Sequence, residues 1–289
     1  MRALIEALRP RQWVKNGLLF AGLIFSKNLT NVADDLLVLG AFGIFCALSS
    51  SVYLINDLAD IERDRVHPVK CRRPLPSGRL SPGVAVVMAL ALGVGGLAGG
   101  YLVHPAFLAL AACYYVLNLA YSFLLKHLVI VDVLSIAIGF VLRAAAGAEA
   151  IQVEISPWLL ICTVLLALFL ALSKRRHELV LLEGTAGNHR RILEEYSPHL
   201  LDQMIAVVTA STVVSYCQYT MAAETVEKFG TSNLVFTVPF VLFGIFRYLY
   251  LVHQKDEGGS PERIPFTDPP MIANLVLWLV TVGIVLYGR

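Results

Sequence analysis

The sequence predicts an all-α, polytopic membrane protein. Of its 289 residues, 57% are hydrophobic and only 15% are charged, and the mean hydropathy is +0.70. A soluble domain carries about 25% charged residues. The apolar residues also gather in runs long enough to cross roughly 30 Å of hydrocarbon as helices. Together these observations exclude an ordinary soluble enzyme, and the basic loops carry no nucleic-acid signature.

Nine runs of mainly apolar residues are candidate spans. The first has a short apolar core that Lys27 cuts off, and the second leads into a cluster of acids. The third contains a glycine-rich stretch, residues 93–100, typical of close helix packing. The fifth carries an embedded Arg143, the sixth leads to a basic triplet, and the other four are apolar runs of similar length. In order, the expected spans are Asn16–Phe25 extended by its flanking turns, Leu36–Ile55, Pro82–Val103, Pro105–Leu124, Val129–Ala148, Pro157–Leu172, Leu200–Ala222, Val235–Val252 and Met271–Tyr287.

The basic residues predict the topology. Of the 23 Lys and Arg residues, 19 fall on one side of the predicted spans, and only Lys27, Lys228 and Arg289 fall on the other. By the positive-inside rule, the N-terminus and the acid cluster face the cytoplasm and the C-terminus lies outside. Because no linker or repeat interrupts the chain, we expect one transmembrane domain over residues 1–289. Its oligomeric state stays open, a homo-oligomer included.

The cysteines and histidines do not predict a zinc site or a disulfide. Four of the five cysteines lie in apolar runs, and no two form a close pair. We interpret them as small buried hydrophobic residues. The histidines also lack the spacing of paired zinc ligands.

A cluster of acids and bases follows the second span. Asp57, Asp60 and Asp64 have the spacing i, i+3, i+7, which places three carboxylates on one face of a helix. Three like charges require a compensating cation, and Mg²⁺ takes oxygen ligands that it shares with substrate phosphates. The downstream bases Lys70 and Arg73 can hold the remaining phosphate charge. The cluster therefore predicts a magnesium–phosphate site.

Other polar residues fall at the same membrane face. Arg2, Arg9 and Trp13 precede the first span, and we interpret them as anchors in the lipid headgroups. Arg143 lies inside a span, where an ionisable side chain is costly and marks a functional candidate. Its structural alternative is a pairing with Glu149, Glu154 or a helix carbonyl. The candidates for substrate contacts are Lys15, Asn16, Asn56, Tyr121, Lys126, Asp132, Arg143, Lys174, Arg175 and Glu178.

These motifs carry a resemblance to a known family. The pattern Asn56-Asp57-x-x-Asp60-x-x-x-Asp64 resembles the first aspartate-rich motif of the UbiA superfamily of intramembrane prenyltransferases, over essentially the whole chain. The resemblance implies nine helices around a central cavity, in a bacterial inner membrane, with the polar motifs on the cytoplasmic face. A closer similarity is to the decaprenyl-phosphate phosphoribosyltransferase branch. It rests on residues 9–16, 67–74, Lys126-His127, Asp132, Arg143 and Lys174-Arg175-x-x-Glu178.

One departure from the superfamily separates its branches. Ordinary members carry a second aspartate-rich motif in the third cytoplasmic loop, where this chain has Lys174, Arg175 and Arg176. One acidic motif facing basic groups suits a donor with an additional phosphate and an anionic acceptor. The resemblance therefore implies Mg²⁺-dependent transfer of a 5-phosphoribosyl group from phosphoribosyl pyrophosphate to a polyprenyl phosphate such as decaprenyl phosphate.

In that reaction the expected metal ligands are Asp57, Asp60 and Asp64, and the expected catalytic residues are these three with Lys70 and Arg73. One alternative is a UbiA-type prenyltransferase that moves a prenyl group to an aromatic or lipid acceptor, against which the basic third loop argues. A second is a non-enzymatic transporter. Transporters place ionisable groups near the midplane of the bilayer, whereas here the groups concentrate at one face.

Overall fold

A computed structural model of the protein describes residues 2–26, 31–67, 69–182, 195–255 and 264–288. Its contacts divide the chain into two compact units, Met1–Glu154 and Ile155–Arg289, and each is described by itself. The described residues form helices and no strand, which confirms the predicted fold class. The single domain stays a prediction. Lys27, Pro68 and Arg289 lie outside the described residues.

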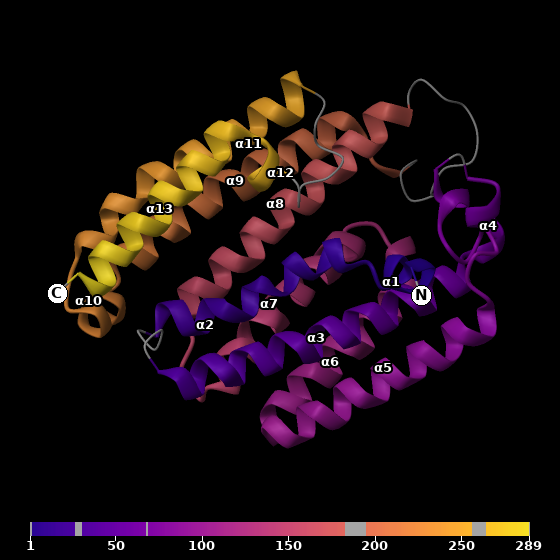
Figure 1. The fold of residues 1–289 in the computed structure, drawn as a ribbon. Helices are drawn as coiled ribbons and strands as arrows, with labels where there is room; N and C mark the ends of the chain where they lie inside the picture. Colours follow the sequence, from indigo (N-terminus) through magenta and orange to yellow (C-terminus); the bar gives the residue numbers. More distant parts are fainter. Residues whose placement is uncertain (1, 27–30, 68, 183–194, 256–263, 289) are drawn as a thin grey trace. The chain divides into compact units, whose positions relative to one another are not determined.

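The first unit is built around the long helices α3, α5, α6 and α7 (Figure 1). The short helices α1, η1 and α2 precede α3, and α4 and η2 follow its C-terminal end. The elements are α1 (Arg2–Leu8), η1 (Pro10–Leu19), α2 (Phe20–Phe25), α3 (Val32–Ala59), α4 (Ile61–Arg65), η2 (Lys70–Arg72), α5 (Pro82–Val103), α6 (Pro105–Phe123), η3 (Leu125–His127) and α7 (Val131–Ala150), where η denotes a 3₁₀ helix.

The second unit consists of four long helices joined by shorter ones. Helices α8 and α9 make the most extensive contact within this unit. The elements are α8 (Pro157–Leu182), α9 (Pro198–Met221), α10 (Ala223–Phe229), η5 (Asn233–Thr237), α11 (Val238–Gln254), α12 (Ile264–Thr267) and α13 (Pro269–Tyr287).

Four of the long helices begin with the same local chemistry. A side chain that accepts a hydrogen bond from a backbone N–H in the first turn stands directly before a proline. The side chain satisfies one of the free N–H groups of the first turn, and the proline fixes a helical φ where no donor is needed. These capping residues are Ser81 in α5, His104 in α6, Ser197 in α9 and Asp268 in α13.

Eight helices in the described part of the chain are long and apolar enough to cross a membrane. They correspond to the second to ninth predicted spans. The first predicted span, Asn16–Phe25, is not a single helix, because it consists of the end of η1 followed by α2. The prediction extends this span by its flanking turns, and η1 and α2 follow each other without a break from Pro10 to Phe25. The segment packs into the first unit, where Leu19 and Leu23 are buried in its core.

Glycines allow the helices of the first unit to approach closely. A Cβ at Gly93 would lie 2.6 Å from the Tyr115 hydroxyl, and one at Gly96 would lie 2.7 Å from Leu48 Cδ2. A Cβ at Gly147 of α7 would lie 2.0 Å from the carbonyl oxygen of Leu19. Gly93 and Gly96 of α5 thus serve helix packing, as predicted for this stretch, whereas a Cβ at Gly95 would meet open space. Gly147 lets the η1–α2 segment rest against α7.

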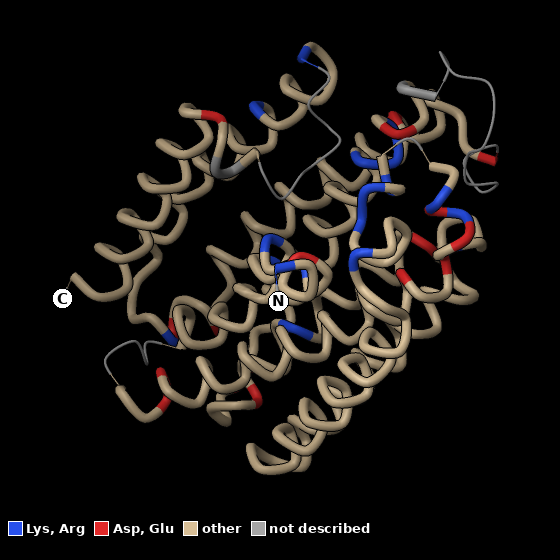
Figure 2. Tube along the Cα trace, turned by 45° about the vertical axis from the view of Figure 1, so that its right-hand side comes forward, with Lys and Arg blue, Asp and Glu red and all other residues tan. Residues whose placement is uncertain are grey.

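Figure 2 shows that long stretches of the helices carry no Lys, Arg, Asp or Glu. Large apolar side chains on these stretches are exposed, among them Leu102, Val87 and Ile284. Such a surface suits contact with lipid hydrocarbon rather than water. Of the five cysteines, Cys46 is buried and Cys113 is exposed, so the interpretation as small buried residues holds for Cys46 but is wrong for Cys113.

Candidate active site

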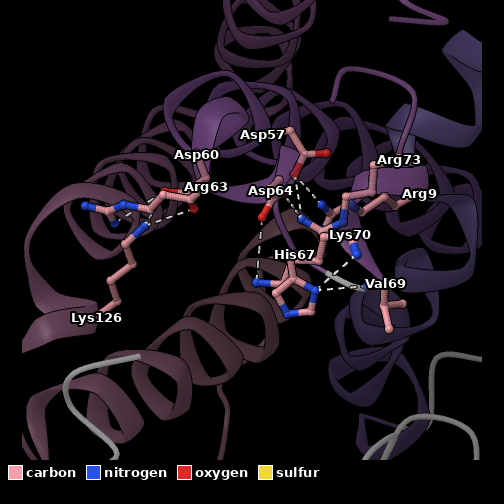
Figure 3. A network of polar contacts seen from close by, with 10 residues as sticks. All are labelled: Arg9, Asp57, Asp60, Arg63, Asp64, His67, Val69, Lys70, Arg73 and Lys126. Atoms are coloured by element: carbon pink, nitrogen blue, oxygen red, sulfur yellow. Dashed lines mark hydrogen bonds and ion pairs between the residues drawn. The ribbon is translucent and has the colours of Figure 1, made fainter. Parts of the chain in front are cut away.

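The buried carboxylate of Asp57 is the centre of a charged network at the end of α3 (Figure 3). Asp57 is only 2% exposed, and its Oδ1 accepts hydrogen bonds from Arg9 Nη2 at 2.5 Å and from Arg73 Nη1 at 3.1 Å. A buried carboxylate is costly unless it is paired and hydrogen-bonded. Two arginines from separate segments, one on each side of α3 in sequence, supply that compensation.

Asp64 joins the same network from α4. It is 3% exposed, its Oδ2 accepts a hydrogen bond from Arg73 Nη1 at 2.7 Å, and Lys70 Nζ lies 3.8 Å from its Oδ1. One nitrogen of Arg73 therefore bridges the carboxylates of Asp57 and Asp64. The structure thus brings together four of the five predicted catalytic residues.

Asp60 lies apart from the other two aspartates. Its carboxylate accepts hydrogen bonds from Lys126 Nζ at 3.2 and 3.3 Å, and Arg63 lies 4.0 Å away (Figure 3). Among the described residues, no group of three or more His, Cys, Asp and Glu side chains is arranged to hold a metal ion. The prediction of three carboxylates on one helix face is therefore wrong.

The reason lies in the backbone at Asp60. Helix α3 ends at Ala59, Asp60 has φ −100° and ψ 8°, and α4 starts at Ile61. The spacing i, i+3, i+7 defines one face only on a continuous helix. The interruption turns Asp60 toward Lys126 of η3, whereas Asp57 and Asp64 stay together.

The loop after α4 positions the bases. The N–H groups of Val69 and Lys70 donate to His67 Nδ1 at 3.1 and 3.2 Å, which orders the start of η2. Arg73 then has extended backbone, φ −62° and ψ 153°, as expected before Pro74. This local chemistry explains why the sequence from His67 to Pro74 directs Lys70 and Arg73 at the acids.

Arg9 is a site residue that sequence reasoning missed. We assigned Arg9 to the headgroups with Trp13, but its guanidinium contacts Asp57 and lies 4.9 Å from the ring centroid of Tyr53. Its backbone is in the left-handed region, with φ 54° and ψ 59°. The Ser50 hydroxyl donates to the carbonyl of Leu8 at 3.0 Å and accepts the indole N–H of Trp13 at 3.0 Å. These contacts hold the segment around Arg9 against α3.

Arg143 forms a second polar group within the first unit. It is 6% exposed and donates to Asn16 Oδ1 at 2.8 Å, to the Tyr114 hydroxyl at 2.7 Å and to the Gly139 carbonyl at 3.0 Å. Its guanidinium also lies 4.6 Å from the Tyr114 ring centroid. Within the described residues it has no ion pair, so neither Glu149 nor Glu154 is its partner.

Among the residues that the structure describes, the contacts of Arg143 leave a buried positive charge without a carboxylate. Within the same residues, the bond to a helix carbonyl is the one structural alternative that is present. Neutral oxygens and an aromatic ring solvate a guanidinium, but they do not neutralise it. The group around Arg143 is therefore suited to an anion. Tyr114 was not predicted, because a tyrosine in an apolar span has no distinguishing sequence signal.

The other candidates of the first unit lie at the same polar segments. Lys126 and Asp132 are buried on η3 and at the start of α7, and Asn16 is buried on η1. Lys15, Asn56 and Tyr121 are half-buried on η1, α3 and α6.

In the second unit, Arg175 is buried on α8 and its Nη1 donates to Glu178 Oε2 at 2.7 Å. Lys174 is half-buried beside it. Arg176 donates to Asp202 of α9 instead. The roles of all these residues stay predictions.

The helices are long and apolar enough to cross a membrane, and a network of acids and bases lies at the end of one of them. Together these features define an integral membrane protein with a polar site. The chain belongs to the UbiA prenyltransferase family, whose match covers residues 17–267. It is a membrane-embedded transferase, and the resemblance inferred from its motifs is confirmed.

Individual relatives agree with this assignment. The chain is 34% identical to a decaprenyl-phosphate phosphoribosyltransferase from Mycobacterium tuberculosis, over 96% of this chain and 92% of that protein. It is 33% identical to the protein of the same name from Corynebacterium glutamicum, over 98% and 86%. The fold is similar to the structure of a UbiA homolog from Archaeoglobus fulgidus bound to GPP and Mg²⁺. That similarity has a TM-score of 0.72 at 18% identity and covers 98% of this chain and 99% of the other.

Proposed function

We propose that the protein transfers a 5-phosphoribosyl group from phosphoribosyl pyrophosphate to a polyprenyl phosphate, such as decaprenyl phosphate, and releases pyrophosphate. The relatives named decaprenyl-phosphate phosphoribosyltransferase support this reaction for the chain. The basic triplet at residues 174–176 also supports it, because two anionic substrates need more bases than one prenyl diphosphate does.

The observation that carries the proposal is the bridge between Asp57 and Asp64. Arg73 Nη1 lies 3.1 Å from one carboxylate and 2.7 Å from the other, so a cation already lies between two buried acids. Mg²⁺ is commonly held by one or two carboxylates together with substrate phosphates. Two aspartates therefore fit the metal when a diphosphate supplies the other oxygens. Bound there, Mg²⁺ would act as a Lewis acid that neutralises charge on the departing pyrophosphate.

The bases around these aspartates suit a diphosphate. Arg9, Lys70 and Arg73 supply three positive charges around two carboxylates. With the carboxylates on Mg²⁺, Arg9 and Arg73 would turn toward phosphate oxygens, with which arginines form strong charge-assisted hydrogen bonds. Asn56 is proposed to orient a carboxylate or bind a ligand oxygen. Asp60 is proposed to position the ammonium group of Lys126 for contact with a substrate.

The buried guanidinium of Arg143 supports an anion site deeper in the same unit. Asn16 and Tyr114 fix its orientation, and among the described residues it has no carboxylate to release before an anion binds. We assign Arg143, Lys126 and the bases of α8, Lys174 and Arg175, to the ribose phosphate and the lipid phosphate. Lys15, Tyr121, Asp132 and Glu178 are proposed to line the substrates or to orient these bases.

The chemistry requires little acid–base catalysis. A phosphate monoester is largely ionised near pH 7, its second pKa being about 6, so its oxygen is already a nucleophile. That oxygen attacks the anomeric carbon as the bond from that carbon to pyrophosphate breaks. Positioning of the two substrates can then supply much of the rate enhancement.

The distribution of bases supports a cytoplasmic site. With the N-terminus inside and the C-terminus outside a bacterial inner membrane, a soluble donor reaches the acids from the cytoplasm, and the lipid enters from the bilayer. The transporter alternative is not retained, because the chain belongs to a family of transferases.

A two-donor assay tests the proposal. Purified protein is given Mg²⁺ and polyprenyl phosphate with phosphoribosyl pyrophosphate, and separately a prenyl diphosphate with an aromatic or lipid acceptor. Pyrophosphate release that requires the lipid phosphate and phosphoribosyl pyrophosphate is the expected result. Activity in the reaction with prenyl diphosphate and its acceptor, without activity in the other reaction, would replace the proposal with the prenyltransferase alternative.

A further inference from the structure

Two segments that are distant in sequence meet at Asp57. The N-terminal segment brings Arg9, and the loop between α4 and α5 brings Arg73, so the two guanidinium groups bind the same carboxylate oxygen. Both arginines are partly exposed and have long, flexible side chains. Their convergence therefore depends on how the backbones of the two segments are held relative to each other.

An ion pair away from the acids joins these two backbones. Arg79 Nη1 donates to Glu6 Oε2 at 2.8 Å, and Arg79 Nη2 donates to Glu6 Oε1 at 3.0 Å. This is the two-pronged geometry in which arginine binds a carboxylate most specifically. Hydrogen bonds from Arg79 lower the pKa of Glu6 below its usual value, so the pair is charged at neutral pH.

Each member of this pair is one hydrogen bond from a site arginine or its neighbour. The backbone N–H of Arg9 donates to the carbonyl of Glu6 at 3.2 Å. On the other side, Arg79 Nη2 also donates to the carbonyl of Arg72, the residue directly before Arg73. The pair thus contacts both backbones at the points where the two site arginines emerge.

The packing beneath the pair joins the same two segments. Ala7 of α1 is buried in one cluster with Leu75 and Leu80 of the loop, together with residues of α3 and α5. This apolar contact holds the segments together but is not directional. The ion pair adds direction, because a planar fork accepts only one arrangement.

We propose that Glu6 and Arg79 are positioning residues that set Arg9 and Arg73 in register over Asp57. The inference rests on the proposed function for its kinetic readout. The pair touches no reacting group, and each side chain is 47% exposed. An ordinary surface ion pair of this exposure contributes little to stability and nothing to catalysis. Substitution of a positioning pair should therefore change kcat/KM, whereas substitution of an ordinary surface pair should not.

The test is a double-mutant cycle on the purified protein with Glu6→Gln, Arg79→Gln and the double variant. Each single variant should lower kcat/KM for phosphoribosyl pyrophosphate by about 10-fold, because small misplacements of a site are costly in rate. The double variant should be no worse than the worse single variant, since both remove the same link. The melting temperature should stay within about 2 °C of that of the wild type.

The chain offers a matched control in the ion pair of Glu62 and Arg65. It is exposed, 2.7 Å long and close in sequence to the site, but it joins residues of one short helix. Glu62→Gln and Arg65→Gln should leave kcat/KM within about twofold of wild type, as expected of a surface pair. The exchange Glu6→Arg with Arg79→Glu should recover part of the loss.

A second readout separates this inference from the proposed reaction. Calorimetric titration with pyrophosphate and Mg²⁺ needs no turnover, and affinity should fall in the Glu6 and Arg79 variants but not in the controls. If wild type fails to use polyprenyl phosphate but this pattern of affinities holds, the proposed function fails and the inference stands. Single variants with wild-type affinity and wild-type kcat/KM would overturn it, as would losses that simply multiply in the double variant.

Discussion

The two units of the molecule treat their buried acids differently. In the second unit, Asp268 binds Arg247 through both oxygens, at 2.8 and 3.0 Å, and also caps α13 by accepting the N–H of Met271. In the first unit, Asp57 and Asp64 share Arg73, and each has a further base nearby. In the first arrangement, one arginine holds both oxygens of one acid. The second is an open network, in which two acids share a base.

The difference separates structure from function. Both oxygens of Asp268 bind the fork of Arg247 and the carboxylate also caps a helix, so its charge is satisfied and a ligand gains nothing by binding there. A network with three bases around two carboxylates has surplus positive charge and interchangeable partners. In the proposed reaction, such a network exchanges its internal contacts for a metal and a diphosphate.

Substitution of the site aspartates should have the largest effect. We expect Asp57→Asn to lower kcat by about 1000-fold, because it removes a charge that acts on the transition state. Asp60→Asn should also abolish turnover, because Lys126 loses the carboxylate that positions its ammonium group. The variants should remain folded and should elute from gel filtration as wild type does. Normal turnover of Asp57→Asn would show that the metal assignment is wrong.

Arg143→Met should have the next largest effect. We expect kcat/KM to fall by about 100-fold, because the proposed donor to a substrate phosphate is lost. The fold should tolerate the change, since no described carboxylate is left unpaired and methionine fills a similar volume. Steady-state kinetics with each substrate varied in turn would identify the phosphate concerned. A melting temperature that falls sharply with unchanged KM values would make Arg143 structural.

Asp268→Asn should give the opposite pattern. Asparagine still caps α13 but loses the charged bonds to Arg247, so we expect a loss of about 1–2 kcal/mol of unfolding free energy. Turnover at a temperature well below melting should be unchanged within about twofold, because Asp268 is not among the residues assigned to the substrates. A large fall in kcat in a fully folded variant would erase the distinction between the two units.

The pH dependence of that variant sharpens the comparison. Hydrogen bonds from Arg247 hold the pKa of Asp268 below its usual range. The pair therefore stabilises the folded protein fully above the unfolded aspartate pKa of about 3.9, and the contribution is lost as pH falls through the lower folded value. The difference in melting temperature between wild type and Asp268→Asn should be constant from about pH 7 to pH 5 and shrink below about pH 4.

Ile130→Gly tests the strain of the backbone that follows Lys126. Ile130 has φ 69° in a turn closed by the Val131 N–H and the Val129 carbonyl at 2.8 Å, just after Lys126. A β-branched residue in this region is strained, by about 1–3 kcal/mol, and glycine relieves the strain. We expect a higher melting temperature with kcat lowered a few-fold. A lower melting temperature would contradict the claim that the backbone at Ile130 is strained.

The sequence predicted the parts of the molecule that local chemistry determines. Eight spans follow from the length of apolar runs, and the grouping of Lys70 and Arg73 with Asp57 and Asp64 follows from short loops. The position of Asp60 did not, because no glycine or proline marks the interruption of α3 at that residue. Spacing alone cannot show where a helix ends.

The missed residues depend on contacts between distant segments. A base before a span has an ordinary explanation in topology, so nothing in the sequence near Arg9 pointed to Asp57, 48 residues away. Likewise, Tyr114 is an aromatic residue in an apolar helix, and only the packing of α6 against α7 brings its hydroxyl to Arg143.

The most direct test of the open network is a density map of the wild-type protein with phosphoribosyl pyrophosphate and Mg²⁺. We expect metal density between Asp57 and Asp64, with the Arg73 guanidinium moved from these carboxylates onto the diphosphate. Arg247 should keep both of its bonds to Asp268. A map in which Arg73 still bridges the two aspartates, with the donor bound elsewhere, would contradict the central claim that this network is the site of phosphoribosyl transfer.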